Sequence, residues 1–565
     1  MSITRKHLSH ALALRIDGRI GRTLLLVFVS CWCGIAMGAV MTDRGLVQGV
    51  QEGNLTVFKG LPFAAPPMGK LRWRAPQPPQ AWQGVKLLDH FAPRCMQKDM
   101  YPENAPAEPM SEDCLYLNLW VPVHAADEKL PVMVWIYGGG LDNGSGSTPL
   151  YAGDVLARQG VIVVTFNYRL GVFGFLAYPQ LAQESPRLAT GNYGLLDQVA
   201  ALQWVHRNIA AFGGDPSRVT VFGQSSGSIS ISALSVSPLT KGLFRYAIGE
   251  SGGLFEPMKL SPELTESGAE KNGVAFAKRA GASFIAALRK ISAAALLKVP
   301  FTPAIILDGA VVPEPPAKAY RQGRIHPVAF LIGSNHDEGE TFLAGKHVTP
   351  QNYDQVLGHD FPSWLVKLVA SSPGNTDASA HDAAKRFEGN VRFHWDMWTW
   401  AHLATIAGKP VYLYRFNHPT LCAQAEGCLV ATRHGDEMAY VFGHDLAHTW
   451  SAQDRALSRV MVQCWTHFAK TGSPSGCGVP NWPSYGNGNS LMMLGDAPHL
   501  TQMRPDHTLR RLDEIYRLAK LVAPHPIVAL VIVLLILGLV VWMLVMFARL
   551  FLRCLRTCSP EPTST

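Results

Sequence analysis

Residues 223–227 read Gly-Gln-Ser-Ser-Gly and directly follow the apolar run Val-Thr-Val-Phe at residues 219–222. That run is typical of a β-strand, and residues 226–236 are compatible with a helix. A chain with 51 glycines can contain the pentapeptide by chance. Its place between a strand and a helix, with glycines that leave room for a tight turn, favours Ser225 as a nucleophile.

The sequence around this turn alternates short β-branched runs with amphipathic stretches and glycine-rich connections. The alternation predicts an α/β fold with a mainly parallel central sheet covered by helices. The predicted strands are 132–136, 161–167, 219–222, 329–332 and 411–416. Residues 195–209 carry apolar side chains at helical spacing, so we expect a helix that packs on the sheet. With no internal repeat in the sequence, we predict one domain over residues 40–522.

Both ends of the chain are more apolar than its centre. Residues 23–39 form an apolar run after a segment rich in Arg and Lys, which predicts that residues 1–39 are a signal peptide or an uncleaved N-terminal anchor. Residues 527–548 carry no charge and are numerous enough to cross a bilayer core of about 30 Å as a helix. We therefore expect a single C-terminal transmembrane helix at 527–548 and a short basic cytoplasmic tail at 549–565. The catalytic domain would then be membrane-anchored and extracytoplasmic, in the periplasm or outside the cell.

The formal net charge of +8 resides mainly at these two ends. Residues 1–38 carry a net charge of +4 and residues 524–565 carry +2, so only +2 remains for the central domain. A domain with so little net charge has no basic patch that calls for a polyanion, and we expect no nucleic-acid partner.

The ten cysteines divide between the ends and the central domain, which contains six. An even number is expected of a protein exported to an oxidising compartment. The hypothesis is three disulfides that close short loops: Cys95 with Cys114, Cys422 with Cys428, and Cys464 with Cys477.

Further motifs follow one another in the order of a known family. They stand at residues 59–64 (Lys-Gly-Leu-Pro-Phe-Ala), 111–118, 167–171, 211–216, 333–339, 434–437 and 465–472. With the turn at 223–227, they make the chain resemble the type-B carboxylesterases, the α/β-hydrolase family that also contains cholinesterases and bile-salt lipases. The resemblance covers about residues 45–500 and implies an α/β-hydrolase fold with carboxylesterase activity.

A serine hydroxyl is a poor nucleophile until a base takes its proton, and an acid must orient that base. The resemblance implies His434 as the base and Glu338 as the acid, and the order Ser225, Glu338, His434 is that of α/β-hydrolases. Asp337 is the alternative acid. The resemblance also implies that the backbone N–H groups of Gly139, Gly140 and Ser226 form the oxyanion hole, and the glycine run at 138–140 follows a predicted strand.

Two differences from the cholinesterases restrict the class of substrate that we expect. Those relatives have Glu before the nucleophile, whereas this chain has Gln224, and the segment from Cys95 to Cys114 contains no Trp that could offer its π face to a cation. Neutral carboxylic esters of small to medium size are therefore the expected small-molecule substrates. The alternative function is that of a non-catalytic, cholinesterase-like cell-surface adhesion protein, a class whose members typically lack an intact triad.

We expect neither a cofactor nor a metal. His444 and His448 stand four residues apart, as metal ligands on a helix would, but no His-Glu-x-x-His pattern and no third ligand accompany them.

Overall fold

The computed structural model of the chain describes residues 38–98, 107–125, 127–184, 190–256, 258, 261–419, 431–445, 450–522, 534 and 537–550. The predicted leader at residues 1–39 and the predicted tail at residues 549–565 lie almost wholly outside the described residues.

An eleven-stranded sheet forms the centre of the fold, in the order β16-β15-β14-β13-β12-β11-β9-β10-β8-β4-β3. Its strands are β3 (Val50–Glu52), β4 (Leu55–Pro62), β8 (Tyr116–Pro122), β9 (Leu130–Ile136), β10 (Ile162–Phe166), β11 (Gly214–Gln224), β12 (Tyr246–Glu250), β13 (Ala329–Asn335), β14 (Val411–Phe416), β15 (Ser490–Leu494) and β16 (His499–Gln502). Strands β10, β9, β11, β12, β13, β14 and β15 pair in parallel, and the strands at both edges pair antiparallel. Every residue of β9 is buried, as expected of a central strand covered on both faces. The predicted α/β fold with a mainly parallel sheet is confirmed.

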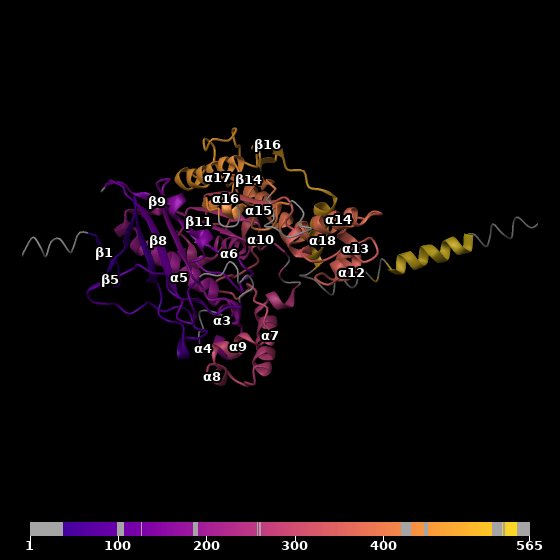
Figure 1. The fold of residues 1–565 in the computed structure, drawn as a ribbon. Coiled ribbons are helices and arrows are strands. Elements are labelled where there is room, and N and C mark those ends of the chain that lie inside the picture. The colour runs from indigo at the N-terminus through magenta and orange to yellow at the C-terminus, as the bar shows by residue number, and fades with distance from the viewer. Residues whose placement is uncertain are drawn as a thin grey trace, which may run out of the picture.

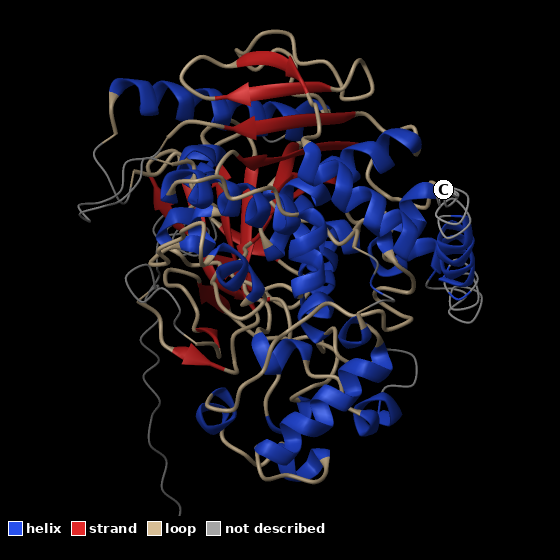
Figure 2. Cartoon of the chain, turned by 90° about the vertical axis from the view of Figure 1, so that its right-hand side faces the viewer, coloured by secondary structure: helices blue, strands red, loops and turns tan. Residues whose placement is uncertain are grey.

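Helices flank this sheet (Figure 2). The helices that contact its strands include α5 (Tyr193–Asn208), α6 (Ser226–Leu234), α15 (Trp395–Ile406) and α17 (Ala452–Thr471). Helix α5 is the helix predicted at residues 195–209, and its apolar positions are buried. Two short sheets lie outside the main one: β1 (Ala39–Met41), β2 (Leu46–Gln48) and β5 (Val85–Leu87) form one, and β6 (Arg94–Cys95) and β7 (Met110–Ser111) form the other.

The remaining helices gather in two groups (Figure 1). Helices α7 (Glu266–Arg279), α8 (Ile285–Leu288) and α9 (Ala293–Leu297) cover a second hydrophobic cluster beside α3 (Gly171–Phe175) and α4 (Pro179–Glu184). Helices α12 (Tyr353–Gly358), α13 (Ser363–Val369), α14 (Asp377–Gly389) and α18 (His507–Val522) pack together at the right of the view in Figure 1. Shorter helices are α2 (Asp154–Ala157), α10 (Pro316–Arg321), α11 (Glu340–Leu343) and α16 (Glu437–Phe442).

Two of the three predicted disulfides are confirmed. Cys95 and Cys114 are bonded with their Cα atoms 5.0 Å apart, and Cys464 and Cys477 are bonded with their Cα atoms 4.7 Å apart. The third predicted pair, Cys422 with Cys428, lies outside the described residues.

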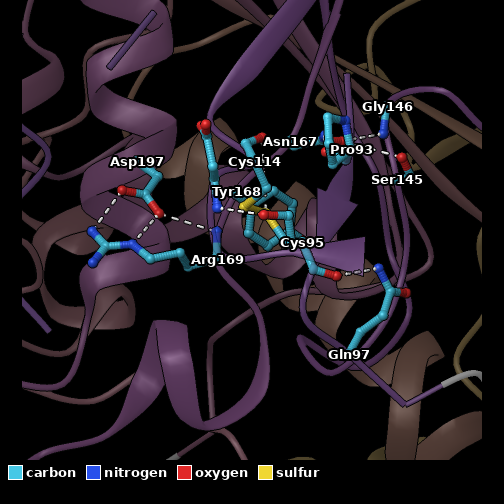
Figure 3. Close-up of a disulfide and its surroundings, with 12 residues drawn as sticks. Pro93, Cys95, Gln97, Cys114, Ser145, Gly146, Asn167, Tyr168, Arg169 and Asp197 are labelled. Atoms are coloured by element: carbon cyan, nitrogen blue, oxygen red, sulfur yellow. Dashed lines mark hydrogen bonds and ion pairs between the residues drawn. A yellow bond between two sulfur atoms is a disulfide. The ribbon is translucent and has the colours of Figure 1, made fainter. Parts of the chain in front are cut away.

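The Cys95–Cys114 disulfide lies beside a buried ion pair (Figure 3). Arg169 donates through Nε and Nη2 to the two oxygens of Asp197, each at 2.7 Å, and the Asp197 side chain has no exposed surface. This two-pronged geometry satisfies both carboxylate oxygens and compensates the cost of burying the charges. The ion pair ties the loop after β10 to helix α5.

The prediction of a C-terminal transmembrane helix at residues 527–548 is corrected. In the described part of the chain, no helix is long and apolar enough to cross a membrane. Residues 527–533, 535 and 536 lie outside the described residues. The prediction counted uncharged residues, and a lack of charge does not by itself establish one continuous helix.

Candidate active site

Ser225 lies at a sharp turn between strand β11 and helix α6. Its backbone has φ 56° and ψ −126°, a strained conformation for a residue with a side chain. A Cβ atom on Gly223 or Gly227 would lie 2.5 Å or 2.0 Å from the carbonyl oxygen of Ile136 in β9, so both positions require glycine. The main chain of the turn is held by the Ser225 N–H, which donates to the carbonyl oxygen of Glu250 at 2.8 Å. These contacts explain the pattern at residues 223–227.

Glu338 follows strand β13 and is completely buried. Its Oε1 accepts from the Ser251 hydroxyl at 2.5 Å and from the backbone N–H of Asn335 at 2.7 Å. Its Oε2 lies 2.6 Å from His434 Nδ1. The alternative acid, Asp337, turns toward Lys385, whose Nζ lies 3.0 Å from Asp337 Oδ1. The structure therefore places Glu338, and not Asp337, on the imidazole of His434.

The ring of His434 is held at both nitrogens. Because Nδ1 faces the Glu338 carboxylate, which only accepts, we assign the proton of the neutral ring to Nδ1 and the lone pair to Nε2. That lone pair faces the side-chain amide of Gln224, whose Nε2 lies 3.2 Å from His434 Nε2. Among the described residues, Ser225 Oγ forms no hydrogen bond with His434; the contact between the histidine and the serine turn runs through Gln224.

One face of the His434 ring is covered by Phe393, a residue that the sequence did not single out. The two ring centroids are 4.2 Å apart and the planes are inclined by 16°, which is a stacked arrangement. Phe393 belongs to a π-helical turn, η8 (Asn390–His394), between α14 and α15. A π turn shifts the helical register of the side chains, and such turns recur at functional sites. Helical periodicity read from the sequence does not locate such a shift.

The glycine run after β9 packs directly against the serine turn. A Cβ atom on Gly138 would lie 2.9 Å from the Cβ of Ser225. Gly139 has φ +102°, and a Cβ there would lie 2.1 Å from Asn143 Oδ1, so neither Gly138 nor Gly139 can accept a side chain. In the described part of the chain, the backbone N–H groups of Gly139, Gly140 and Ser226 donate to no backbone carbonyl. They are therefore available to a negatively charged oxygen, as the predicted oxyanion hole requires.

The disulfide loop supports this glycine run. The side-chain amide of Gln97, two residues after Cys95, donates to the carbonyl of Gly144 at 2.9 Å and accepts from the N–H of Gly144 at 2.8 Å. It also donates to the carbonyl of Cys95 at 3.0 Å. The side chain of Gln97 therefore connects the chain beside the Cys95–Cys114 disulfide to the segment that carries Gly139 and Gly140.

The structure describes only one of the two histidines that stand four residues apart, His444 and His448. His444 Nε2 lies 2.9 Å from the Ala152 carbonyl oxygen and 3.2 Å from Asp154 Oδ1, whereas His448 lies outside the described residues. No group of three or more His, Cys, Asp or Glu side chains that could hold a metal ion occurs within the described ranges.

Known proteins are similar to this chain over most of its length. Residues 37–510 match the family described as the carboxylesterase family. The chain is 39% identical over 480 residues to the fumonisin B1 esterase of Sphingopyxis macrogoltabida, and the alignment covers 80% of this chain and 86% of that protein. It is 35% identical over 504 residues to the para-nitrobenzyl esterase of Bacillus subtilis (strain 168), covering 84% of this chain and 97% of that protein.

Solved structures agree with these sequence relatives. A structure of a PNB esterase superposes with a TM-score of 0.73 at 32% sequence identity, over 84% of this chain and 99% of that one. A structure described as a thermophilic PNB esterase superposes with a TM-score of 0.74, also at 32% identity. The chain therefore belongs to the carboxylesterase family and is a carboxylic ester hydrolase.

Proposed function

We propose that the chain hydrolyses neutral carboxylic esters of small to medium size through an acyl-enzyme on Ser225. The observation that carries the proposal is the 2.6 Å contact between His434 Nδ1 and the buried Glu338 Oε2, beside the strained turn at Ser225. A buried carboxylate in this position holds the imidazole in one tautomer and stabilises the imidazolium that forms when the base takes a proton.

The proposed reaction has two halves. Ser225 Oγ attacks the ester carbonyl carbon while His434 Nε2 takes the hydroxyl proton, and the carbonyl oxygen, now negative, faces the N–H groups of Gly139, Gly140 and Ser226. His434 then gives the proton to the departing alcohol. In the second half, water loses a proton to His434 and attacks the acyl carbon. The bond to Ser225 Oγ then breaks, His434 returns the proton to that oxygen, and the acid is released. The amide of Gln224 must leave His434 Nε2 before either proton transfer.

The uncharged side chain of Gln224 supports the proposal that the substrates are neutral esters. Gln224 is buried against His434 and has no negative charge to offer a substrate cation. The relatives named for fumonisin B1 and para-nitrobenzyl esters are esterases, which favours an enzyme over the alternative of an adhesion protein. We propose para-nitrobenzyl and para-nitrophenyl esters as the first substrates to test.

The test is the variant Ser225→Ala, assayed with p-nitrophenyl butyrate and labelled with a fluorophosphonate probe. We expect hydrolysis and labelling to be lost together, because the nucleophilic oxygen is removed. Ser235→Ala, at the C-terminal end of helix α6, is the matched control and should keep both. Full activity in Ser225→Ala would exclude the mechanism.

We also propose that the catalytic domain works outside the cytoplasm. The disulfides Cys95–Cys114 and Cys464–Cys477 support this location, because structural disulfides form and persist in oxidising compartments. Mass spectrometry of unreduced peptides from the protein in its native host is the measurement. Free thiols at these four cysteines would contradict the proposal.

A further inference from the structure

Two fully buried carboxyl groups lie behind the triad acid, and the mechanism above does not use them. Glu250 is the last residue of β12, and Glu437 is the first residue of α16. The backbone carbonyl oxygen of Glu250 accepts a hydrogen bond from the N–H of Ser225. The side chain of Asn335 donates to Glu437 Oε2, while its backbone N–H donates to Glu338 Oε1 at 2.7 Å. Both carboxyl groups therefore adjoin residues of the proposed triad.

Each of these carboxyl groups has one oxygen with a donor and one without. Glu250 Oε1 accepts from the indole N–H of Trp465 at 2.6 Å, and Glu437 Oε2 accepts from Asn335. Within the described residues, Glu250 Oε2 and Glu437 Oε1 have no hydrogen-bond partner. Neither group forms an ion pair with a described Lys, Arg or His; the buried carboxylates that do, such as Asp197, are paired closely. Two ionised carboxylates with unpaired oxygens would be very costly to bury.

The titratable groups that interact with Glu250 and Glu437 bring no positive charge to these two carboxyl groups. Residues Glu250, Gly333 and Tyr414 are neighbours across β12, β13 and β14. A Cβ atom on Gly333 would lie 2.3 Å from the Tyr414 ring, so that ring occupies the space over Gly333. The titratable groups that interact with the pair are Tyr414, Tyr151 at the end of η3 (Pro149–Tyr151) and Glu338. Burial raises the pKa of both tyrosines above the ordinary value, so they stay neutral and Glu338 contributes a further negative charge.

We propose that Glu250 and Glu437 hold one proton between them at neutral pH, so that the pair carries one negative charge behind Glu338 instead of two. A proton on one carboxyl group supplies the donor that the two unpaired oxygens lack. It also removes one of two negative charges next to Glu338 and Asn335, and so keeps this loop in place. The role of the pair in positioning Glu338 rests on the proposed function, whereas the presence of the proton does not.

The electrostatics of the two groups agree with the geometry. Burial raises the pKa of the Glu250 carboxyl to about 8. Burial, followed by the negative charges of Glu250 and Glu338, holds the pKa of the Glu437 carboxyl well above its ordinary value. Because the two groups interact, the proton belongs to the pair and not to either residue alone.

Infrared spectroscopy of the whole protein tests the proton directly. At neutral pH we expect the C=O stretch of a protonated carboxyl group, shifted on transfer to D2O, in the wild type and in the control variant Glu340→Gln. Glu340 is a nearby carboxylate that pairs with His381 Nε2 at 2.8 Å. In the double variant Glu250→Gln, Glu437→Gln the band should lose intensity, because both carboxyl groups that hold the proton are removed. A missing band in the wild type, or an unchanged band in the double variant, would overturn the proposal.

The pH dependence of unfolding gives a second measurement. The folded protein keeps a proton that the unfolded chain loses above its ordinary glutamate pKa, so folded stability falls as pH rises between the ordinary value and about 8. Relative to the double variant Glu250→Gln, Glu437→Gln, the unfolding constant of the wild type should rise by up to about tenfold per pH unit within this window. Parallel curves for the two proteins would refute the shared proton. Both measurements are independent of catalysis, so an inactive protein that shows the band would count against the proposed function alone.

Discussion

Replacing Gln224 with Glu tests how the environment of His434 sets the pH range of the enzyme. The amide Nε2 of Gln224 lies 3.2 Å from His434 Nε2, and the Gln224 side chain is buried. An amide can donate to the neutral imidazole and, after turning over, accept from the imidazolium. A carboxylate can only accept, so it favours the imidazolium, which cannot act as a base.

The size of the effect follows from this distance. Opposite unit charges at 3.2 Å attract by about 5 kcal/mol at an effective dielectric constant of about 20, and 1.36 kcal/mol corresponds to about one pH unit. This is an upper bound, because the new carboxylate must itself be desolvated in a nearly closed site. Opposite charges at such distances shift titrations by about 1–3 units. We expect the acid limb of kcat/KM to move to higher pH by that amount.

The assay is the pH profile of kcat/KM with the neutral ester p-nitrophenyl butyrate, measured for the wild type, Gln224→Glu and Gln224→Met. The Met variant keeps the volume of the side chain without a charge, so it separates the electrostatic effect from a packing effect. Its acid limb should stay close to that of the wild type. If the limb of Gln224→Glu coincides with that of Gln224→Met, the reasoning about His434 Nε2 is refuted.

Two further substitutions address packing. Phe393→Leu removes the ring stacked on His434; since such ring pairs contribute about 0.5–1.5 kcal/mol, we expect kcat/KM for p-nitrophenyl butyrate to fall by about 2- to 12-fold, and an unchanged value would show that the stacking has no role. Asp197→Ala leaves the guanidinium of Arg169 buried without its partner and should lower the free energy of unfolding in urea by about 3–5 kcal/mol. The double variant Arg169→Met, Asp197→Leu should recover most of that loss, and a single-variant cost below about 1 kcal/mol would contradict the assignment.

The central strands could be predicted from the sequence because they are buried on both faces. Strand β14 has the predicted bounds, and the observed β9 extends the predicted strand 132–136 by two residues. The antiparallel edge strands, such as β3 and β16, were missed because they are short and their residues are exposed, so no apolar run marks them. The predicted span at 527–548 was wrong: among the residues that the structure describes, no helix is long and apolar enough to cross a membrane, and a run without charges does not by itself establish such a helix.

By itself, the sequence determined the local chemistry: glycines where a Cβ atom would collide with β9, a serine between them, and a parallel α/β arrangement set by hydrophobic runs. Its resemblance to the carboxylesterases also named Glu338 as the acid, with Asp337 as the alternative. Only the tertiary structure decided which of them faces His434, and only it placed Gln224 and Phe393 on the ring. The physical reason is that these contacts join segments far apart in the chain, so their distances depend on how the sheet and the helices pack and not on any local pattern of residues.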